Sequence, residues 1–171
     1  MKTLRILTFA ASLLAMQTLA AQNPAISTVY SDVEIARMME QFRAAKSHDV
    51  IPPSNLQQKF HADFPNARDV DWEVANEIYE VEFEIRYRDF KVFYDKNGNL
   101  LMVVEEFRSW ELPAVVKNAA EAKYPNSKFD DIAKIRRGTE TLYKVEMGKR
   151  DVEVKLLIKS DGTVLNERFD Y

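Results

Sequence analysis

The chain contains two copies of one unit, and this duplication constrains its fold more than any other feature. At an offset of 60, Phe64-Pro65-Asn66 aligns with Tyr124-Pro125-Asn126. Four inserted residues then change the offset to 64, which aligns Tyr79-Glu80-Val81-Glu82 with Tyr143-Lys144-Val145-Glu146. Because a unit of about 60 residues buries little apolar surface by itself, the two copies are expected to share one core.

Each copy, at residues 51–107 and 111–171, shows the same predicted order of one helix and four strands. Pro53 or Pro113 begins the helix, because N–H groups of the first turn have no acceptor within the helix and proline lacks only that group. A second proline ends the helix. Alternation of apolar and charged residues then indicates strands with one buried and one solvated face. The predicted strands are 68–74, 77–87, 89–95 and 99–107, and then 128–137, 140–147, 151–159 and 163–170.

The longest alternation covers residues 79–87. Its charged members are expected to face solvent, among them Glu80, Glu82 and Glu84. Trp72 alternates with two valines, which predicts a place in the core. The apolar members of the alternation are expected to face the helix: Tyr79, Val81, Phe83, Ile85 and Tyr87.

Residues 1–21 have the composition of a secretory signal peptide. Lys2 and Arg5 precede an apolar stretch, and small residues follow, so cleavage is expected after Ala20 or Ala21. The alternative is an N-terminal core helix. Cleavage changes the formal net charge from −3 to −5, because the segment holds two basic and no acidic residues. No second long apolar stretch follows, so no transmembrane segment is expected after cleavage.

The absence of cysteine matters because an exported protein reaches an oxidising compartment. It excludes disulfides, thiol catalysis, cysteine-ligated metals and a lipid anchor on cysteine, so stability must come from the packed core. The acidic excess argues against nucleic acid as a partner, since that needs clustered lysine and arginine. We therefore expect a periplasmic or secreted protein.

Residues 22–50 precede the repeats and are expected to form a linker and one more helix, at about 32–46. Ser31 and Glu34 have the spacing of a capping box. The charges on the polar side of this helix are mixed, which favours docking on the repeats over a membrane surface. The apolar stripe that would dock consists of Ile35, Met38, Met39, Phe42 and Ala45.

The repeated unit resembles the PepSY-like family of secreted bacterial proteins, whose structural relatives include the beta-lactamase inhibitor protein. The motifs behind the resemblance are [Phe/Tyr]-Pro-Asn-[Ala/Ser], Tyr-x-Val-Glu and a final Asn-Gly or Asp-Gly turn. The resemblance covers residues 51–171. It implies an α+β fold in which two tandem α-β-β-β-β repeats form one curved antiparallel sheet with helices on one face. It also implies export and no catalysis, so an enzyme is not expected.

No motif in the chain predicts a catalytic, metal or cofactor site. His48 and His61 lack metal-ligand spacing, no G-x-S-x-G elbow is present, and the four glycines are not clustered. The turn from Asp95 to Asn99 lacks the glycine and glutamate positions of a calcium loop, so a hairpin is favoured.

Apolar residues on the polar side of the strands are the main anomaly. If Val92 faces the helix, Phe93 faces the open side, as does its repeat equivalent Leu157. Either Met102 with Val104, or Leu101 with Val103, joins that face. Such a patch indicates an interface, although the N-terminal helix or a second subunit of a homodimer could cover it. Trp110 in the connector is expected to wedge the repeats together, with partner contact as the alternative.

Two function hypotheses remain open. The first is an exported, non-enzymatic binding protein, inhibitor-like in character, whose partner is a protein or envelope component. Its candidate residues are Phe93, Leu157, Met102, Val104 and Trp110. The second is a periplasmic protein that binds a small molecule or a cation at Glu80, Glu82 and Glu84. The simpler interpretation is a solvated strand face, whose charge Arg86, Arg88 and Lys91 nearby could neutralise.

Overall fold

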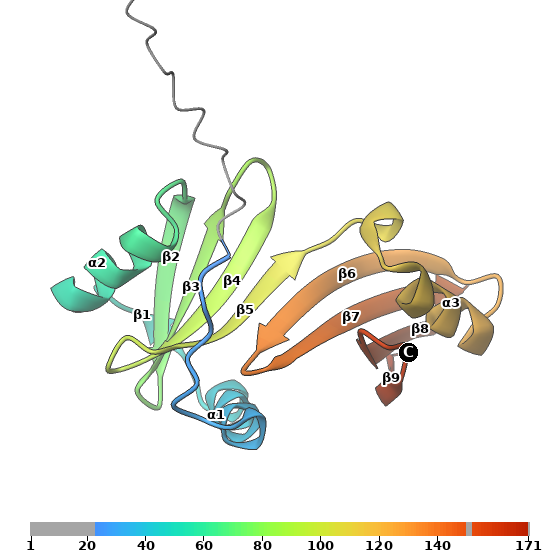
Figure 1. Cartoon of the computed structure of the whole chain (residues 1–171), viewed down its shortest axis with the longest axis horizontal. Helices are drawn as coiled ribbons and strands as arrows, with labels where there is room; N and C mark the ends of the chain where they lie inside the picture. The colour runs from blue at the N-terminus through green and yellow to red at the C-terminus, as the bar shows by residue number, and fades with distance from the viewer. Residues whose placement is uncertain (1–22, 150–151, 171) are drawn as a thin grey trace, which may run out of the picture.

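Within residues 23–149 and 152–170, which the computed structural model describes, nine antiparallel strands form one open sheet (Figure 1). They follow one another in the sheet in chain order. The first repeat contributes β2 (Arg68–Ala75), β3 (Ile78–Glu84), β4 (Asp89–Asp95) and β5 (Leu100–Glu106). The second contributes β6 (Lys128–Arg137), β7 (Glu140–Lys149), β8 (Val152–Lys159) and β9 (Val164–Asp170). The predicted signal peptide at 1–21 lies outside the described residues.

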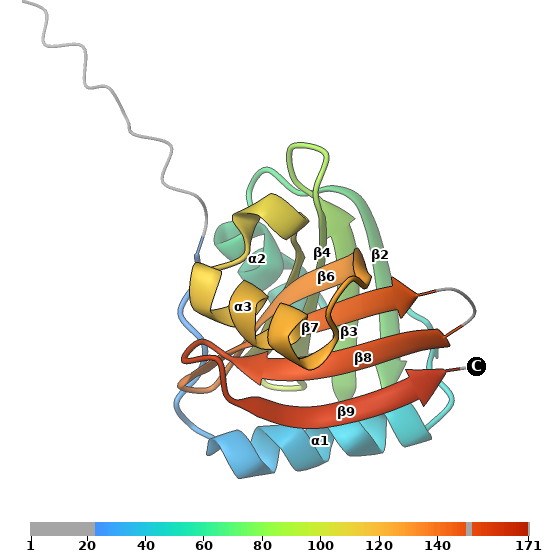
Figure 2. The ribbon, with the colours of Figure 1, turned by 90° about the vertical axis from the view of Figure 1, so that its right-hand side faces the viewer.

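The helices α2 (Ser54–Asp63) and α3 (Ala114–Lys123) occupy equivalent places in the two repeats. Both lie on the same side of the sheet (Figure 2). Each begins directly after a proline and ends where the next proline excludes the α conformation. This confirms the predicted α+β fold with tandem repeats.

Two apolar cores form where each helix packs on its half of the sheet. In the first repeat, Leu56, Phe60 and Phe64 of α2 cover the apolar face of β3, β4 and β5. In the second, Val116 and Ala120 of α3 cover the corresponding face of β6, β7 and β8. Trp72 packs against the first core, as predicted, with its ring centroid 5.4 Å from that of Phe60.

The two halves join through β5 and β6, which pair from Met102 opposite Arg137 to Glu106 opposite Ala133. The strands of the second repeat are turned relative to those of the first (Figure 1). A short strand that was not predicted, β1 (His48–Asp49), extends the sheet beside β2.

The prediction that Tyr87 lies on the buried face is wrong. The strand β3 ends at Glu84, and the chain reverses through a tight turn in which Ile85 and Arg88 exchange backbone hydrogen bonds of 3.0 and 3.2 Å. Tyr87 lies at the tip of this turn and is 87% exposed. The regular alternation therefore continues in the sequence beyond the end of the strand.

The helix α1 (Asp32–Ala44) lies on the other face of the sheet from α2 and α3. The predicted capping box is present, since Ser31 and Glu34 satisfy each other's backbone N–H groups. The buried side chains of α1 are Ile35, Met39 and Phe42. They pack on Phe93, Leu101 and Met102, and the rings of Phe42 and Phe93 meet edge to face at 5.5 Å.

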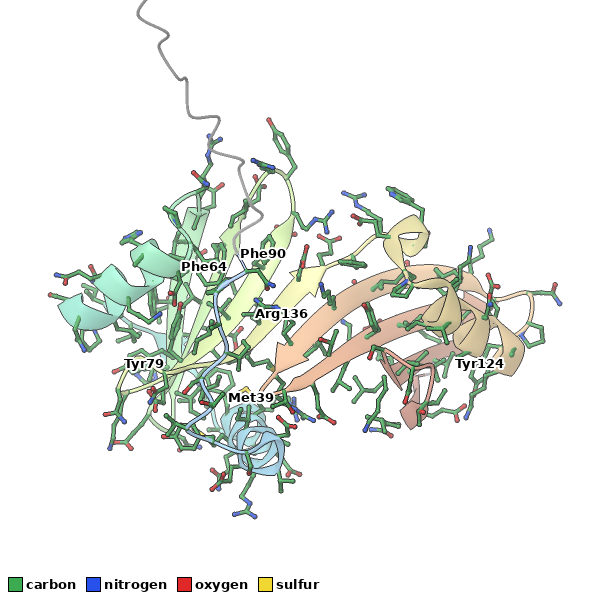
Figure 3. All side chains as sticks on the ribbon, viewed as in Figure 1. Met39, Phe64, Tyr79, Phe90, Tyr124 and Arg136 are labelled. Carbon is green, nitrogen blue, oxygen red and sulfur yellow. The ribbon has the colours of Figure 1, made fainter. Side chains whose placement is uncertain are left out.

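The two ends of α1 are held by equivalent hairpins of the two repeats. At its start, Asp32 accepts hydrogen bonds of 2.8 Å from both the backbone N–H and the hydroxyl of Thr139, in the β6–β7 hairpin. Near its end, the carbonyl of Gln41 accepts a bond of 3.1 Å from Asn76, in the β2–β3 hairpin. The helix thus spans the junction of the repeats, with Met39 at that junction (Figure 3).

The segment before α1 passes from the helix side of the sheet to the open side. Ile26 packs with the core beneath α2, and the carbonyl of Pro24 accepts a 3.0 Å hydrogen bond from Arg136 at the junction (Figure 3). The backbone N–H of Ser27 then donates to Leu100, and the hydroxyl of Tyr30 donates to Asp95. No helix in the described part of the chain is long and apolar enough to cross a membrane.

Candidate functional site on the open face of the sheet

A groove of about 320 Å³ lies on the open face, on the side of the sheet away from α2 and α3. Strands of both repeats line it, from β2 to β7. Alternation along the strands places the charged lining side chains opposite the two helix-covered cores, whereas Phe83 and Phe90 belong to the core beneath α2. The groove contains seven carboxylates (Asp69, Asp71, Glu82, Glu84, Asp89, Glu106 and Asp131), two lysines (Lys91 and Lys144) and four apolar residues (Phe83, Phe90, Val104 and Ala133).

Lys91 neutralises part of the predicted acidic face. Its ammonium group bonds Glu80 at 2.7 Å and also contacts Glu82. Burial raises the pKa of Glu80, although the bond from Lys91 opposes the shift. The same lysine lowers the pKa of Glu82. Glu80 and Glu82 are therefore held by a cation of the protein itself.

Five of the seven groove carboxylates form no ion pair with any residue in the described ranges. They are Asp69, Asp71, Glu84, Asp89 and Glu106. Glu84 accepts one bond of 3.3 Å, from the backbone N–H of Tyr87. Charges of one sign along a groove focus the electrostatic field, so this face attracts cations.

The second repeat carries a related arrangement that differs in one charge. Lys144 stands where the first repeat has Glu80, whereas Glu146 and Lys155 are the equivalents of Glu82 and Lys91. Glu146 is buried between Lys144 at 3.0 Å and Lys155 at 3.2 Å, and the two lysines also pair with Asp131 and Glu153. The groove carboxylates without an ion pair to a described residue all belong to the first repeat.

The residues predicted to bind a partner are distributed over three environments. Val104 lines the groove. Phe93 and Met102, at 5% and 8% exposure, lie beneath α1, so that helix covers them within the chain. Leu157 is partly exposed on the open face of the second repeat, outside the groove. Trp110 is 76% exposed, so the expectation that it wedges the repeats together is wrong.

The glutamates predicted to bind a cation do not converge on one point. Glu82 and Glu84 line the groove, whereas Glu80 is buried against Lys91. In the part of the chain that the structure describes, no three histidine, aspartate or glutamate side chains are grouped closely enough to hold a metal ion. The arrangement favours contact with an extended cationic group over chelation of a single ion.

The acidic residues of β2 and β6 were not singled out from the sequence as site residues. Asp71 and Asp131 occupy equivalent positions of the two repeats, at an offset of 60. Both line the groove, one from each side of the junction. The repeat alignment therefore contained a signal for them, although it could not show that the two aspartates border one groove.

The carboxylate of Asp95 organises the β4–β5 turn, which is a hairpin as predicted. It accepts bonds of 2.8 Å from the backbone N–H groups of Asn97 and Asn99, and one of 2.9 Å from Tyr30. Burial by itself would raise the pKa of Asp95, but these bonds, together with the Asn99 side chain, outweigh it and lower the pKa from 3.8.

Replacing Asp95 by asparagine should therefore cost stability in a pH-dependent way. A carboxyl whose pKa is lowered by folding stabilises the fold above its unfolded pKa, and this contribution is lost as the pH falls through the folded value. We expect D95N to lose about 1–2 kcal/mol at pH 7, and less at pH 3. Urea denaturation of both proteins at the two pH values measures this. An equal loss at both would contradict the role of the charge.

Comparisons with known proteins agree with this architecture. The chain matches the PepSY-like, beta-lactamase-inhibitor-like family twice, over residues 38–102 and 104–166. A BLIP-like protein from Bacteroides fragilis is 26% identical with a TM-score of 0.62, over 70% of this chain and 87% of its own. A DUF2874 family protein from Bacteroides ovatus is 21% identical with a TM-score of 0.64, over 70% and 89%.

A third similar structure, from Bacteroides eggerthii, is named as a periplasmic protein. It is 18% identical with a TM-score of 0.65, over 70% of this chain and 90% of its own. A search of curated proteins finds no match. The tandem family match covers most of the sequence, and each matched segment covers most of one structural repeat. The chain belongs to the PepSY-like family of beta-lactamase-inhibitor-like proteins.

Proposed function

We propose that this protein is an exported, non-enzymatic binding protein that holds a cationic segment of a protein partner in the open-face groove. The observation that carries the proposal is the groove itself, in which five of seven carboxylates have no ion pair with a described residue. Lysine and arginine side chains of a partner would supply the missing counter-charges. Electrostatic complementarity of this kind accelerates association and selects the partner.

An extended protein segment suits the groove better than a single small ion. The carboxylates are spread along strands from both repeats, and Val104 and Ala133 provide apolar surface among them. An extended chain projects alternate side chains to one face, so lysines at every second position could meet several carboxylates at once. An inhibitor-like role is a special case of this proposal, in which the bound segment belongs to an enzyme. The names of the beta-lactamase-inhibitor-like relatives support it.

The alternative, a small molecule or metal cation at Glu80, Glu82 and Glu84, has less support. Lys91 already neutralises two of these glutamates, so a bound cation would have to displace a lysine of the chain. Of the three glutamates only Glu84 has no ion pair with a described residue, whereas four further groove carboxylates outside this cluster have none: Asp69, Asp71, Asp89 and Glu106. We therefore place the binding site along the groove and not at the glutamates alone.

A labelled peptide of alternating lysine and glycine tests the proposal by fluorescence anisotropy. We expect saturable binding that weakens as salt increases, because salt screens the charges. The double variant Asp71→Lys with Glu106→Lys should bind at least about 30-fold more weakly, since it reverses two charges in the groove.

A matched control variant has the same change in net charge at a distance from the groove. Glu40→Lys on α1 with Glu121→Lys on α3 alters two exposed residues that do not line the groove. It should keep affinity within about threefold. If control and groove variants lose the same affinity, the peptide responds to net charge alone and the proposed site is wrong.

A further inference from the structure

The β3–β4 hairpin exposes a bulky tip in an unfavourable backbone conformation. Arg86 and Tyr87 form its two-residue turn with φ values of 53° and 62°. Turns of this type require positive φ at both central positions, where asparagine and glycine are normally found. Arg86 and Tyr87 are both exposed. The tip thus carries two large exposed side chains at positions where glycine or asparagine would fit the backbone conformation better.

A second exposed aromatic residue lies on the neighbouring connector. The short 3-10 helix η1 (Ser109–Glu111) carries Trp110, which is 76% exposed. Arg88 at the base of the hairpin bonds Glu111 at 2.6 Å and Glu105 at 2.8 Å, which fastens the connector to the hairpin. Exposed tyrosine, tryptophan and arginine are the residues most enriched at the centres of protein interfaces.

The tip and the groove adjoin each other and carry opposite charge. Glu84 and Asp89, which flank the hairpin turn, both line the groove. Arg86 at the tip forms no ion pair with a residue in the described ranges, just as Asp71 and Glu106 in the groove form none. A cationic aromatic projection and an acidic groove therefore stand side by side on the same chain.

We infer that the protein forms a two-fold symmetric dimer in which the Arg86–Tyr87 tip of each copy enters the groove of the other. In a two-fold arrangement every contact occurs twice. When the tip of one copy binds the groove of the other, the groove of the first copy therefore receives the tip of the second. The occupant is a second copy because the complementary charge is on the chain itself. The hairpin and α1 lie at opposite ends of the strands, so α1 leaves this end open (Figures 1 and 2).

This inference goes beyond the proposed function and does not depend on it, although the two involve the same groove. A dimer would occupy the groove that a cationic partner needs, so partner binding and dimer formation should compete. A basic peptide would then convert dimer to monomer. The protein would then have two mutually exclusive states, a dimer with occupied grooves and a monomer that binds the partner.

Sedimentation velocity of the purified exported chain from about 5 μM to 0.5 mM tests the dimer. We expect a concentration-dependent shift from monomer to dimer that weakens with added salt. Arg86→Glu should raise the dimer dissociation constant at least about tenfold, and Asp71→Arg or Glu106→Arg should each do the same. Arg43→Glu, an exposed charge reversal on α1, should leave it unchanged.

Charge exchange separates a direct contact from a general effect of net charge. Two double variants combine Arg86→Glu with either Asp71→Arg or Glu106→Arg. In at least one of them the dimer dissociation constant should return to within about threefold of that of the unchanged protein, because the reversed charges attract again. Circular dichroism of each variant checks that it is folded. A chain that stays monomeric to 0.5 mM, or a failure of both exchanges to restore the dimer, overturns the inference. Peptide binding by a monomeric chain would still support the proposed function.

Discussion

Replacing Phe93 by aspartate should lower the free energy of unfolding by about 3–5 kcal/mol, or prevent folding altogether. Phe93 is 5% exposed on the open face of the sheet, where its ring meets Phe42 of α1. Aspartate at this place would put an unpaired charge beneath the helix. Either the charge stays buried, or α1 leaves the sheet and exposes the apolar surface that it covers.

The repeat equivalent of Phe93 provides a matched control. Leu157 lies at an offset of 64, on the same face of the second repeat, but it is partly exposed. Leu157→Asp should therefore cost less than about 1.5 kcal/mol, because water reaches the new carboxylate. Urea denaturation followed by circular dichroism measures both. Equal losses would show that α1 does not shield the first repeat as described.

Replacing Phe60 by alanine should cost about 3–5 kcal/mol. Phe60 is fully buried at the centre of α2, with the rings of Phe64, Trp72 and Phe83 between 5.0 and 5.6 Å away. Its removal leaves a cavity that these rigid neighbours cannot fill. The same denaturation experiment measures the loss of stability.

Two comparisons sharpen this test. His61 is the next residue of α2 but is exposed, so His61→Ala should change stability by less than about 0.5 kcal/mol. The second repeat has Ala120 at the position equivalent to Phe60, also fully buried. If F60A is nearly neutral, the first core resembles the second closely enough to close around a small residue, and the expected cavity does not form.

Most strand positions could be predicted because they follow from local patterns. Alternation predicted β4 at 89–95 and β6 at 128–137, and both strands have these bounds. The strand β3 shows the limit of this reasoning, since the alternation continues through Tyr87 while the strand ends at Glu84. A turn that contains neither glycine nor asparagine leaves no mark in the pattern.

The residues of the candidate site were only partly predictable. Val104, Glu82 and Glu84 were singled out from the sequence, and all three line the groove. Of the three basic residues expected near Glu80, Lys91 of the neighbouring strand is the one that pairs with it, and the strand register makes this choice. The groove itself brings together residues as distant in sequence as Asp69 and Lys144.

Local sequence patterns are enough to predict the repeats, the order of helix and strands within each, and the two helices that cover them. These features follow from periodicity, proline and turn residues, which act over a few positions of the chain. The surface that the open face offers to a partner depends on the tertiary structure. The helix α1 crosses the junction and covers Phe93 and Met102, while the carboxylates of both repeats remain uncovered. That outcome depends on how distant segments pack, because burial and charge pairing are properties of neighbours in space.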